Sequence, residues 1–551
     1  MTLTAGRPTP AGTTTSASRN ALAGTGTLIR FILRRDRVRI PVWLGALTLL
    51  TVSTAISFPD IYPTAADRQA RAELIESPAG IAMSGPGFGL DDYTYGSMLA
   101  QEVVGFVALF AGIMSVLLLV RHTRAEEETG RAELVRAAVV GRHAHLAAGF
   151  VVVGATNLVL GALHALVLPV LGLESIGWTG SLALGASIAG AGLVFTAVAA
   201  VTVQVTGYAR GASGLALAAV GVAFALRAVG DIGDGTLSWL SPIGWAQQTR
   251  SFVDERWWVL ALPLVTTALL GAAAFVLSTH RDVSAGLRQS KPGPGTASRR
   301  LTTPLGFALR VHSGALIAWC VGLFVFGIMF GSILADVEAF VSENELIQDA
   351  VANIGGATAL DSFLTMIVSI LATVSTIFGI LTIQRMRSEE TSGRVEPLLS
   401  TALSRTRWAG SHLTVALAGG AAVMLSAGLG LAISASFAVE DASMFGDMLG
   451  ASLAYVPALW ISVGLAMAIF GLAPRAIGLA WAVLVYALVL SMFGSLLKFP
   501  GWMNDLSPFA HVPGLPAEEF TITPIVVLTA ITTGLIWIGV AAFRRRDLTT
   551  N

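Results

Sequence analysis

Long apolar runs are the feature that most restricts what this chain can fold into. Several of them reach about 20 residues, the length that crosses the hydrocarbon core of a bilayer as an α-helix. The runs are continuous and rich in Leu, Ala, Val and Gly, without the alternation of a β-barrel strand, so helices are favoured. Charged residues make up only 12 % of the 551 residues, about half the fraction of a soluble domain. We therefore expect an all-α integral membrane protein.

The runs predict twelve transmembrane helices, arranged as two homologous halves of six. The first six fall at 40–58, 103–120, 145–170, 180–206, 212–230 and 257–279. The second six fall at 314–335, 363–383, 411–437, 448–472, 477–497 and 524–543. The polar segment 281–306 contains Pro, Gly and Ser, and we interpret it as a linker between halves 40–280 and 307–551. Residues 1–25 lack an apolar run and are expected to form a disordered tail, and 26–39 are expected to form an amphipathic helix in the headgroup region.

A polar segment occurs twice and supports an internal duplication. Residues 124–135 read RAEEETGRAELV and residues 387–398 read RSEETSGRVEPL, with six of twelve positions identical. Each copy follows the second apolar run of its half. The identical positions, with the arginine that follows each copy at the same distance, are Arg124/Arg387, Glu126/Glu389, Glu127/Glu390, Gly130/Gly393, Arg131/Arg394, Glu133/Glu396 and Arg142/Arg405.

The basic residues predict which side of the membrane these segments occupy. With both termini and the linker placed in the cytoplasm, 28 of the 34 Lys and Arg residues lie on the cytoplasmic side, as the positive-inside rule requires. Both repeated segments are then cytoplasmic. Gly130 and Gly393 are expected to end the preceding helix in a left-handed conformation. A helix of about ten residues is expected to follow each glycine.

We interpret the two segments as docking elements for an ATP-hydrolysing partner. The alternative is that their charges only anchor the neighbouring helices at the membrane surface. Anchoring accounts for the arginines, but acidic residues such as Glu127 and Glu390 work against retention on the positive side. The docking interpretation is therefore preferred.

Three features together resemble a known family: FILRRDRVRIPVW at 31–43, the two repeated segments, and LSPIGWAQQTRSF at 240–252 with LSPFAHVPGLPAEEF at 506–520. They resemble the permease subunit of type-2 ABC exporters, in the fused twelve-span branch of polyketide-antibiotic or multidrug exporters of actinobacteria. The resemblance implies a bacterial plasma-membrane protein that exports hydrophobic or amphipathic small molecules. It also implies that each segment is a coupling helix in a cleft of a nucleotide-binding subunit. The implied coupling residues are Glu126, Glu127, Gly130, Arg131, Glu133, Arg142, Glu389, Glu390, Gly393, Arg394, Glu396 and Arg405.

The chain is not expected to be an enzyme or to bind a cofactor itself. A phosphate-binding loop needs Gly-Lys-Ser/Thr, and the only two lysines, Lys291 and Lys498, follow Ser290 and Leu497. ATP and Mg²⁺ are therefore expected to bind to a separate ABC ATPase subunit, in two copies for the two segments. No metal-ligand spacing and no nucleic-acid partner are predicted.

A few residues within the spans are candidates for a substrate cavity. Phe106, Phe110 and Met114 recur at helical spacing in the second span, a stripe that is more often packing or lipid contact. Asn157 and His164 share a face of the third span, where interhelical hydrogen bonding is the commoner role. Arg227 lies one turn from an acidic residue with which it can pair.

Three other functions stay open. A proton-coupled secondary transporter also has two six-span halves, but it needs membrane-buried carboxylates, and here the acids cluster at span ends. An ABC exporter of a lipid or cell-envelope precursor shares every feature above except the cargo. A membrane-embedded enzyme that acts on lipids needs an interfacial polar cluster, for which His511 with Glu518 and Glu519 is thin support.

Overall fold

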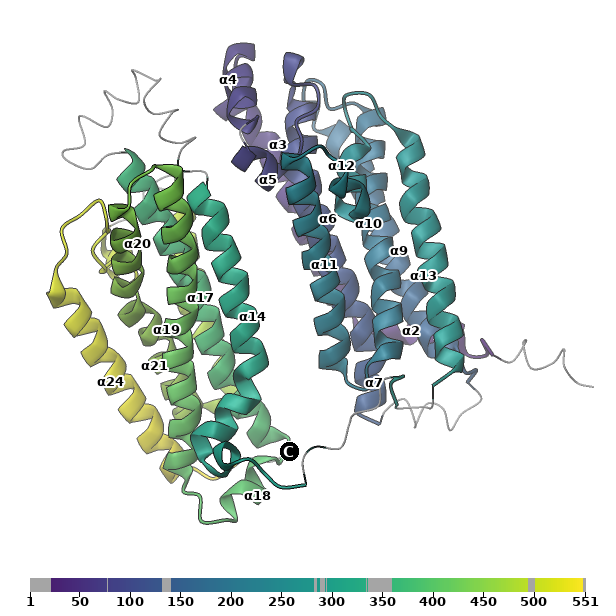
Figure 1. The fold of residues 1–551 in the computed structure, drawn as a ribbon. Coiled ribbons are helices and arrows are strands. Elements are labelled where there is room, and N and C mark those ends of the chain that lie inside the picture. The colour runs from purple at the N-terminus through teal and green to yellow at the C-terminus, as the bar shows by residue number, and fades with distance from the viewer. Residues whose placement is uncertain are drawn as a thin grey trace, which may run out of the picture. The chain divides into compact units, whose positions relative to one another are not determined.

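The structure is a computed structural model that describes residues 21–76, 78–130, 140–281, 285–287, 293, 295–332, 334, 359–493 and 501–548. Every regular element among these residues is helical, and eleven helices within them are long and apolar enough to cross a membrane. The chain divides into two compact units, Met1–Pro292 and Gly293–Asn551 (Figure 1). The division falls inside the predicted linker. The predicted tail at residues 1–20 lies outside the described residues.

The first unit is a bundle of long helices with α6 and α10 inside it. Most of the apolar stretch of these two helices is buried, whereas only a minor part of α3, α11 and α13 is buried. An apolar outer surface is what a bundle surrounded by lipid needs. The long helices are α3 (Arg39–Ile61), α6 (Tyr95–His122), α9 (Ala144–Val170), α10 (Trp178–Val205), α11 (Ala209–Ile232) and α13 (Ala261–Thr279), the last preceded by the 3₁₀ turn η3 (Trp257–Leu260).

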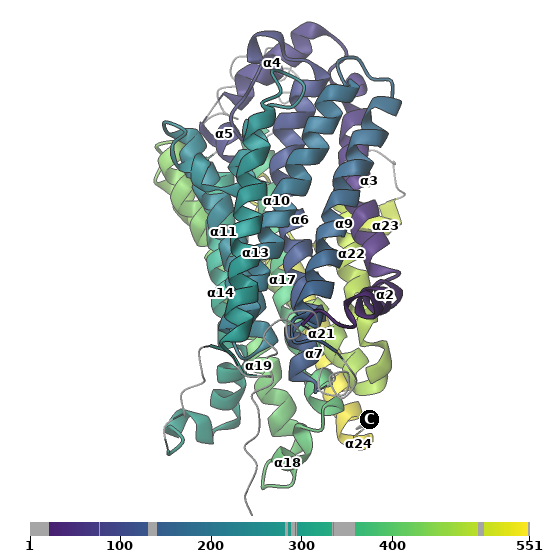
Figure 2. The same cartoon turned by 90° about the vertical axis from the view of Figure 1, so that its right-hand side faces the viewer.

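Short helices lie at both ends of the first unit. The amphipathic α2 (Thr25–Arg35) crosses the long helices near one end (Figure 2), and it buries Leu28 and Ile32 against α9. The predicted amphipathic helix is thus present but ends at Arg35, before α3 begins. The opposite end carries α4 (Ala65–Ile75), α5 (Pro78–Ser84), η1 (Leu90–Asp92), η2 (Leu237–Leu240) and α12 (Pro242–Gln248).

The second unit is also a bundle of long helices, in which most of the apolar stretch of α17 and α21 is buried and only a minor part of α14 and α24 is buried. It begins with the 3₁₀ turn η4 (Arg299–Thr302). Its long helices are α14 (Pro304–Ser332), α17 (Ala359–Thr391), α19 (Arg405–Ala438), the pair α20 (Ser443–Ala454) and α21 (Val456–Leu472), and α24 (Ile522–Arg545). The apolar run predicted at 477–497 is divided between the 3₁₀ helix η5 (Pro474–Ala480) and α22 (Trp481–Phe493), and its end lies outside the described residues. Eleven spans are therefore described, and the twelfth stays a prediction. The short α23 (Gly501–Asp505) follows.

Glycines set the spacing between neighbouring helices in both units. A Cβ built on Gly161 of α9 lies 2.4 Å from the carbonyl oxygen of Gly185 in α10. In the second unit, a Cβ built on Gly471 of α21 lies 2.1 Å from the carbonyl oxygen of Gly539 in α24. Helices in lipid associate through close packing rather than through the hydrophobic effect, so small residues at such contacts let the backbones approach.

Candidate functional site

Each repeated segment begins by continuing the second long helix of its unit, and this helical part ends next to a glycine. In the first unit, α6 breaks at Thr123 and the short α7 (Arg124–Glu128) follows. In the second unit, α17 runs unbroken to Thr391. Gly130 and Gly393 have φ angles of 72° and 71°, which confirms that each takes the left-handed conformation. Their amides donate to the carbonyls of Glu127 and Glu390 at 3.1 and 3.0 Å.

The helix after the glycine is shorter than predicted in the second unit. It is α18, which spans only Val395–Leu399, so the expectation of about ten residues is wrong there. The hydroxyls of Ser400 and Thr401 donate back to the carbonyls of Pro397 and Leu398, at 2.9 and 2.6 Å. Such local side-chain bonds compete with continuation of a helix. In the first unit the corresponding residues, including Arg131 and Glu133, lie outside the described residues.

Glu127 is buried and bonded within its own unit. Its two carboxylate oxygens accept from both terminal nitrogens of Arg281, at 2.7 and 2.9 Å. Arg124, one turn earlier on α7, donates to the same carboxylate at 2.5 Å. Arg281 lies two residues after the end of α13, so this contact joins the second long helix of the unit to the sixth.

Glu390 makes the corresponding contact in the second unit. Arg546 donates to its two oxygens at 2.6 and 2.7 Å, and Arg387 lies 3.6 Å away. Arg546 follows the last residue of α24, as Arg281 follows α13. Glu390 is 1 % exposed. Glu127 and Glu390 therefore form ion pairs with arginines of their own chain. Their predicted contact with another subunit stays a prediction.

The neighbouring acids Glu126 and Glu389 pair differently in the two units. Glu126 accepts from Arg35 of α2 at 2.5 Å, so the segment in the first unit is tied to the amphipathic helix. Glu389 instead lies 3.6 Å from Arg385 and 3.2 Å from Arg394, both within the second segment. The two copies are thus similar in sequence but are attached to different neighbours.

Arg142 and Arg405 each contact the C-terminal end of the sixth long helix of their own unit. Arg142 donates to the carbonyl of Thr279 at 2.7 Å, and Arg405 donates to the carbonyl of Arg546 at 2.6 Å. A cation beside the free carbonyls at a helix C-terminus is favourable.

Partial burial and the neighbouring Arg142 guanidinium lower the pKa of His143, so its imidazole is neutral at pH 7.

The exposed charged side chains of the second segment lie after the glycine. Arg394 has 61 % of its side chain exposed, and Glu396 and Pro397 are exposed as well. These residues, rather than the buried Glu390, form the surface that a partner can reach. Sequence reasoning grouped them together because all belong to one repeated pattern.

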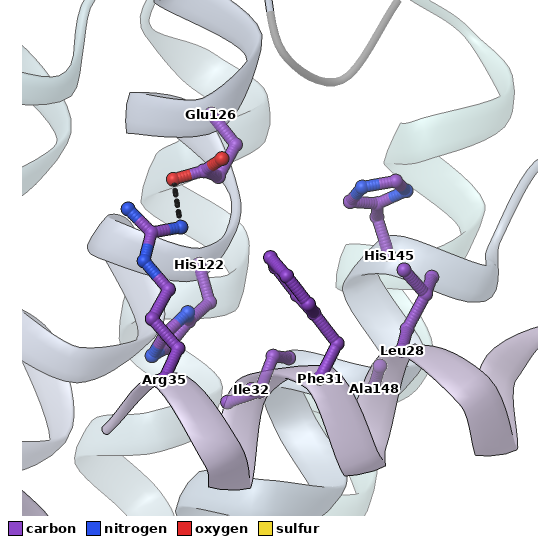
Figure 3. A pocket seen from close by; sticks show the side chains of 8 residues that line it. All are labelled: Leu28, Phe31, Ile32, Arg35, His122, Glu126, His145 and Ala148. Carbon is purple, nitrogen blue, oxygen red and sulfur yellow. Dashed lines mark hydrogen bonds and ion pairs between the residues drawn. The ribbon is translucent and has the colours of Figure 1, made fainter. Parts of the chain in front are cut away.

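A pocket of about 300 Å³ lies between α2 and the ends of α6 and α9 (Figure 3). The ion pair between Arg35 and Glu126 forms part of its polar wall. His122, which also lines it, bonds to the buried Asp36 at 2.6 Å. The complete lining is Leu28, Phe31, Ile32, Arg35, His122, Glu126, His145 and Ala148.

Two of the candidate substrate residues are used in helix packing. Asn157 is fully buried and donates to Ser115 of α6 at 2.8 Å and to Thr196 of α10 at 3.3 Å. His164 is also fully buried, with one ring nitrogen 2.9 Å from the Thr51 hydroxyl of α3. Both residues thus make the interhelical hydrogen bonds that the sequence favoured over a substrate contact.

The other candidates do not share one surface. Met114 is buried in the core, whereas Phe110 is 38 % exposed. Phe106 packs against Phe224 of α11, with ring centroids 6.4 Å apart. Arg227 is fully buried, pairs with Asp231 at 3.6 Å as predicted, and donates to backbone carbonyls of α5. The substrate-contacting role of all six residues stays a prediction.

Sequence reasoning missed Arg281 and Arg546 as members of the site. The signal was present, because each arginine lies just beyond the sixth apolar run of its half. From the sequence alone, both arginines counted only as cytoplasmic charges.

Among the described residues, no group of three or more His, Cys, Asp or Glu side chains is arranged to hold a metal ion.

Comparison with known proteins gives two findings. The family model described as "Multidrug efflux system permease Rv1217c, C-terminal domain" matches residues 26–277 and 301–544. Over 553 residues the chain is 40 % identical to the "Multidrug efflux system permease protein Rv1217c" of Mycobacterium tuberculosis (strain ATCC 25618 / H37Rv). That alignment covers 98 % of each chain.

Proposed function

Because this chain belongs to the family of the multidrug efflux system permease Rv1217c, we propose that it is the membrane subunit of an ATP-driven exporter of hydrophobic or amphipathic small molecules. The chain is a multi-pass bacterial membrane protein. Antibiotics and drugs are the proposed cargo, since the related protein is named for multidrug efflux. A lipid or cell-envelope precursor has the same amphipathic character and is the second candidate cargo.

The energy comes from a separate ABC ATPase subunit. Neither of the two lysines of the chain follows a glycine, so the chain has no Gly-Lys-Ser/Thr loop to hold the phosphates of ATP. Two copies of the ATPase would dock, one at each repeated segment, and they would hold the ATP and Mg²⁺.

One observation carries the proposal: the same polar segment ends the second long helix in both units. In each copy the helical part ends next to a left-handed glycine. In the second copy, the exposed Arg394 and Glu396 follow that glycine. A pattern that serves only to anchor a helix does not need this matched geometry. We propose that the segments are coupling elements in the cytoplasm.

The same proposal includes twelve spans, two duplicated halves and cytoplasmic termini. The duplication is supported by the two matched segments, 26–277 and 301–544, and by the corresponding pairs Glu127–Arg281 and Glu390–Arg546. The orientation is supported by the basic residues that flank the same ends of the helices in both units.

The test is co-purification of the full chain from bacterial membranes, with ATP hydrolysis measured on the purified complex. The variant is Arg394→Glu with Glu396→Lys, which reverses two exposed charges and leaves the buried Glu390 in place. We expect the wild-type chain to retain the ATPase at both segments and the variant to lose about half of it, because the first repeated segment is unchanged. Arg299→Glu, an exposed charge reversal outside the segment, is the control and should retain the ATPase.

Two results would overturn the proposal. The same amount of ATPase per chain on the double variant as on the control would show that the second segment is not a docking site. Transport into vesicles driven by a proton gradient without ATP would favour a secondary transporter instead.

A further inference from the structure

Each unit contains a carboxylate–guanidinium clamp, by which we mean Glu127–Arg281 in the first unit and Glu390–Arg546 in the second. Both clamps have two parallel N–H···O bonds, with distances between 2.6 and 2.9 Å. This bidentate geometry fixes orientation as well as distance. The clamp residues are separated by 154 and 156 positions in the sequence, so the contact depends on the whole unit being folded.

Both clamps also reach the fourth long helix of their unit. The Nε of Arg281 donates to the side-chain oxygen of Gln204 in α10 at 2.6 Å. The guanidinium of Arg546 lies over the ring of Phe470 in α21, 4.9 Å from its centroid. A hydrogen bond and a cation–π contact are different interactions, yet both join the arginine to the fourth long helix of its unit. Each clamp therefore ties together the ends of three long helices.

The chemistry of the clamps is poorly explained by stability alone. Taking two opposite charges out of water is expensive, and an apolar pair of similar volume is often as stable. An apolar pair, however, slides and repacks, whereas a bidentate ion pair holds one relative position. The same expensive contact occurs in both units, at the point where the repeated segment meets the sixth long helix. Such a contact suits the transfer of a displacement between those two elements.

We propose that Arg281 and Arg546 are positioning residues that pass the movement of each repeated segment on to α13 and α24. This inference rests on the proposed function, because the movement originates in the ATPase subunit. When that subunit moves the segment, the glutamate of the segment moves with it. The glutamate then displaces its arginine partner and, with it, the C-terminal end of the sixth long helix. Glu127 and Glu390 then act inside the permease, where they connect the docking surface to the sixth long helix.

The experiment uses the full chain reconstituted in vesicles with its co-purified ATPase subunit. The variants are Arg281→Lys, Arg546→Lys and both together, since lysine keeps the charge and loses the bidentate geometry. Three quantities are measured: the ATPase retained, the rate of ATP hydrolysis, and the cargo transported per ATP. Arg545→Lys makes the same change at an exposed position of the same helix end and serves as the matched control.

We expect the double variant to retain the ATPase and hydrolyse ATP, but to transport about tenfold less cargo per ATP, a typical size for coupling between distant sites. A purely structural role would instead lower hydrolysis and transport in proportion, together with the yield of folded protein. Where Arg281→Lys fails to fold, Glu127→Gln gives the same test, because it keeps the shape of the side chain and removes its charge.

The two proposals fail in different ways. Wild-type transport per ATP in the double variant overturns the clamp as a link and leaves the ATP-driven exporter standing. Proportional loss of hydrolysis and transport also overturns it, because the ratio is unchanged. Absence of any ATPase on the wild-type chain overturns the proposed function, and the clamp inference falls with it.

Discussion

Replacement of Arg546 by Met should destabilise the second unit strongly. The substitution removes both N–H donors to Glu390 and keeps an apolar chain of similar length beside Phe470. Loss of one partner of a buried ion pair costs about 3–5 kcal/mol, because the other charge is left buried. Arg387, 3.6 Å from Glu390, compensates in part, so the expected loss is about 3 kcal/mol. At roughly 2–4 °C per kcal/mol, the melting temperature should fall by about 6–12 °C.

The assay is thermal unfolding of the purified chain in detergent, followed by tryptophan fluorescence. A fixed scan rate is needed, since irreversible unfolding makes the apparent Tm depend on that rate. A second variant combines Arg546→Met with Glu390→Gln, which removes the stranded charge. It should recover roughly half of the loss, because a neutral amide is less costly to bury than a carboxylate.

The control for this cycle is Arg545→Met, at an exposed position, which should melt within about 1 °C of the wild type. A Tm of Arg546→Met equal to that of the wild type would refute the reasoning. So would a double variant whose loss is the sum of the two single losses, because additivity means that the two residues do not interact.

Two further predictions concern glycines and use the same assay. Gly393→Ala should lower the Tm by a few degrees, because a left-handed conformation costs a non-glycine residue about 1–2 kcal/mol. Gly410→Ala, in the second turn of helix α19 with open space around its Cβ, should raise it slightly. Gly161→Ala should destabilise the contact between α9 and α10, because the added Cβ would lie 2.4 Å from a backbone carbonyl. A Tm for Gly161→Ala equal to that of the wild type would show that the two helices can separate freely.

The long helices were predictable because a single physical requirement, the length of apolar chain that spans a bilayer, determines them. The left-handed glycines were predictable for a similar reason, since few residues tolerate that conformation. Helix ends were less predictable. Helix α17 continues to Thr391, because charged residues that leave the membrane do not interrupt backbone hydrogen bonding.

The partners of the buried carboxylates could not be read from the sequence. Glu127 and Glu390 looked like surface charges, because a polar segment between apolar runs is normally exposed. Their partners, Arg281 and Arg546, follow about 150 residues later, and no local pattern connects the two members of a pair. Only the packing of the sixth long helix against the fourth, α13 against α10 and α24 against α21, brings them together.

The order of the clamp residues along the chain has a consequence for biosynthesis. Glu127 leaves the ribosome 154 residues before Arg281, an interval of roughly 8–30 s at 5–20 residues per second. During this time the carboxylate can accept from Arg124 but not yet from Arg281. Each half therefore acquires its final form only when its last helix has been delivered to the membrane.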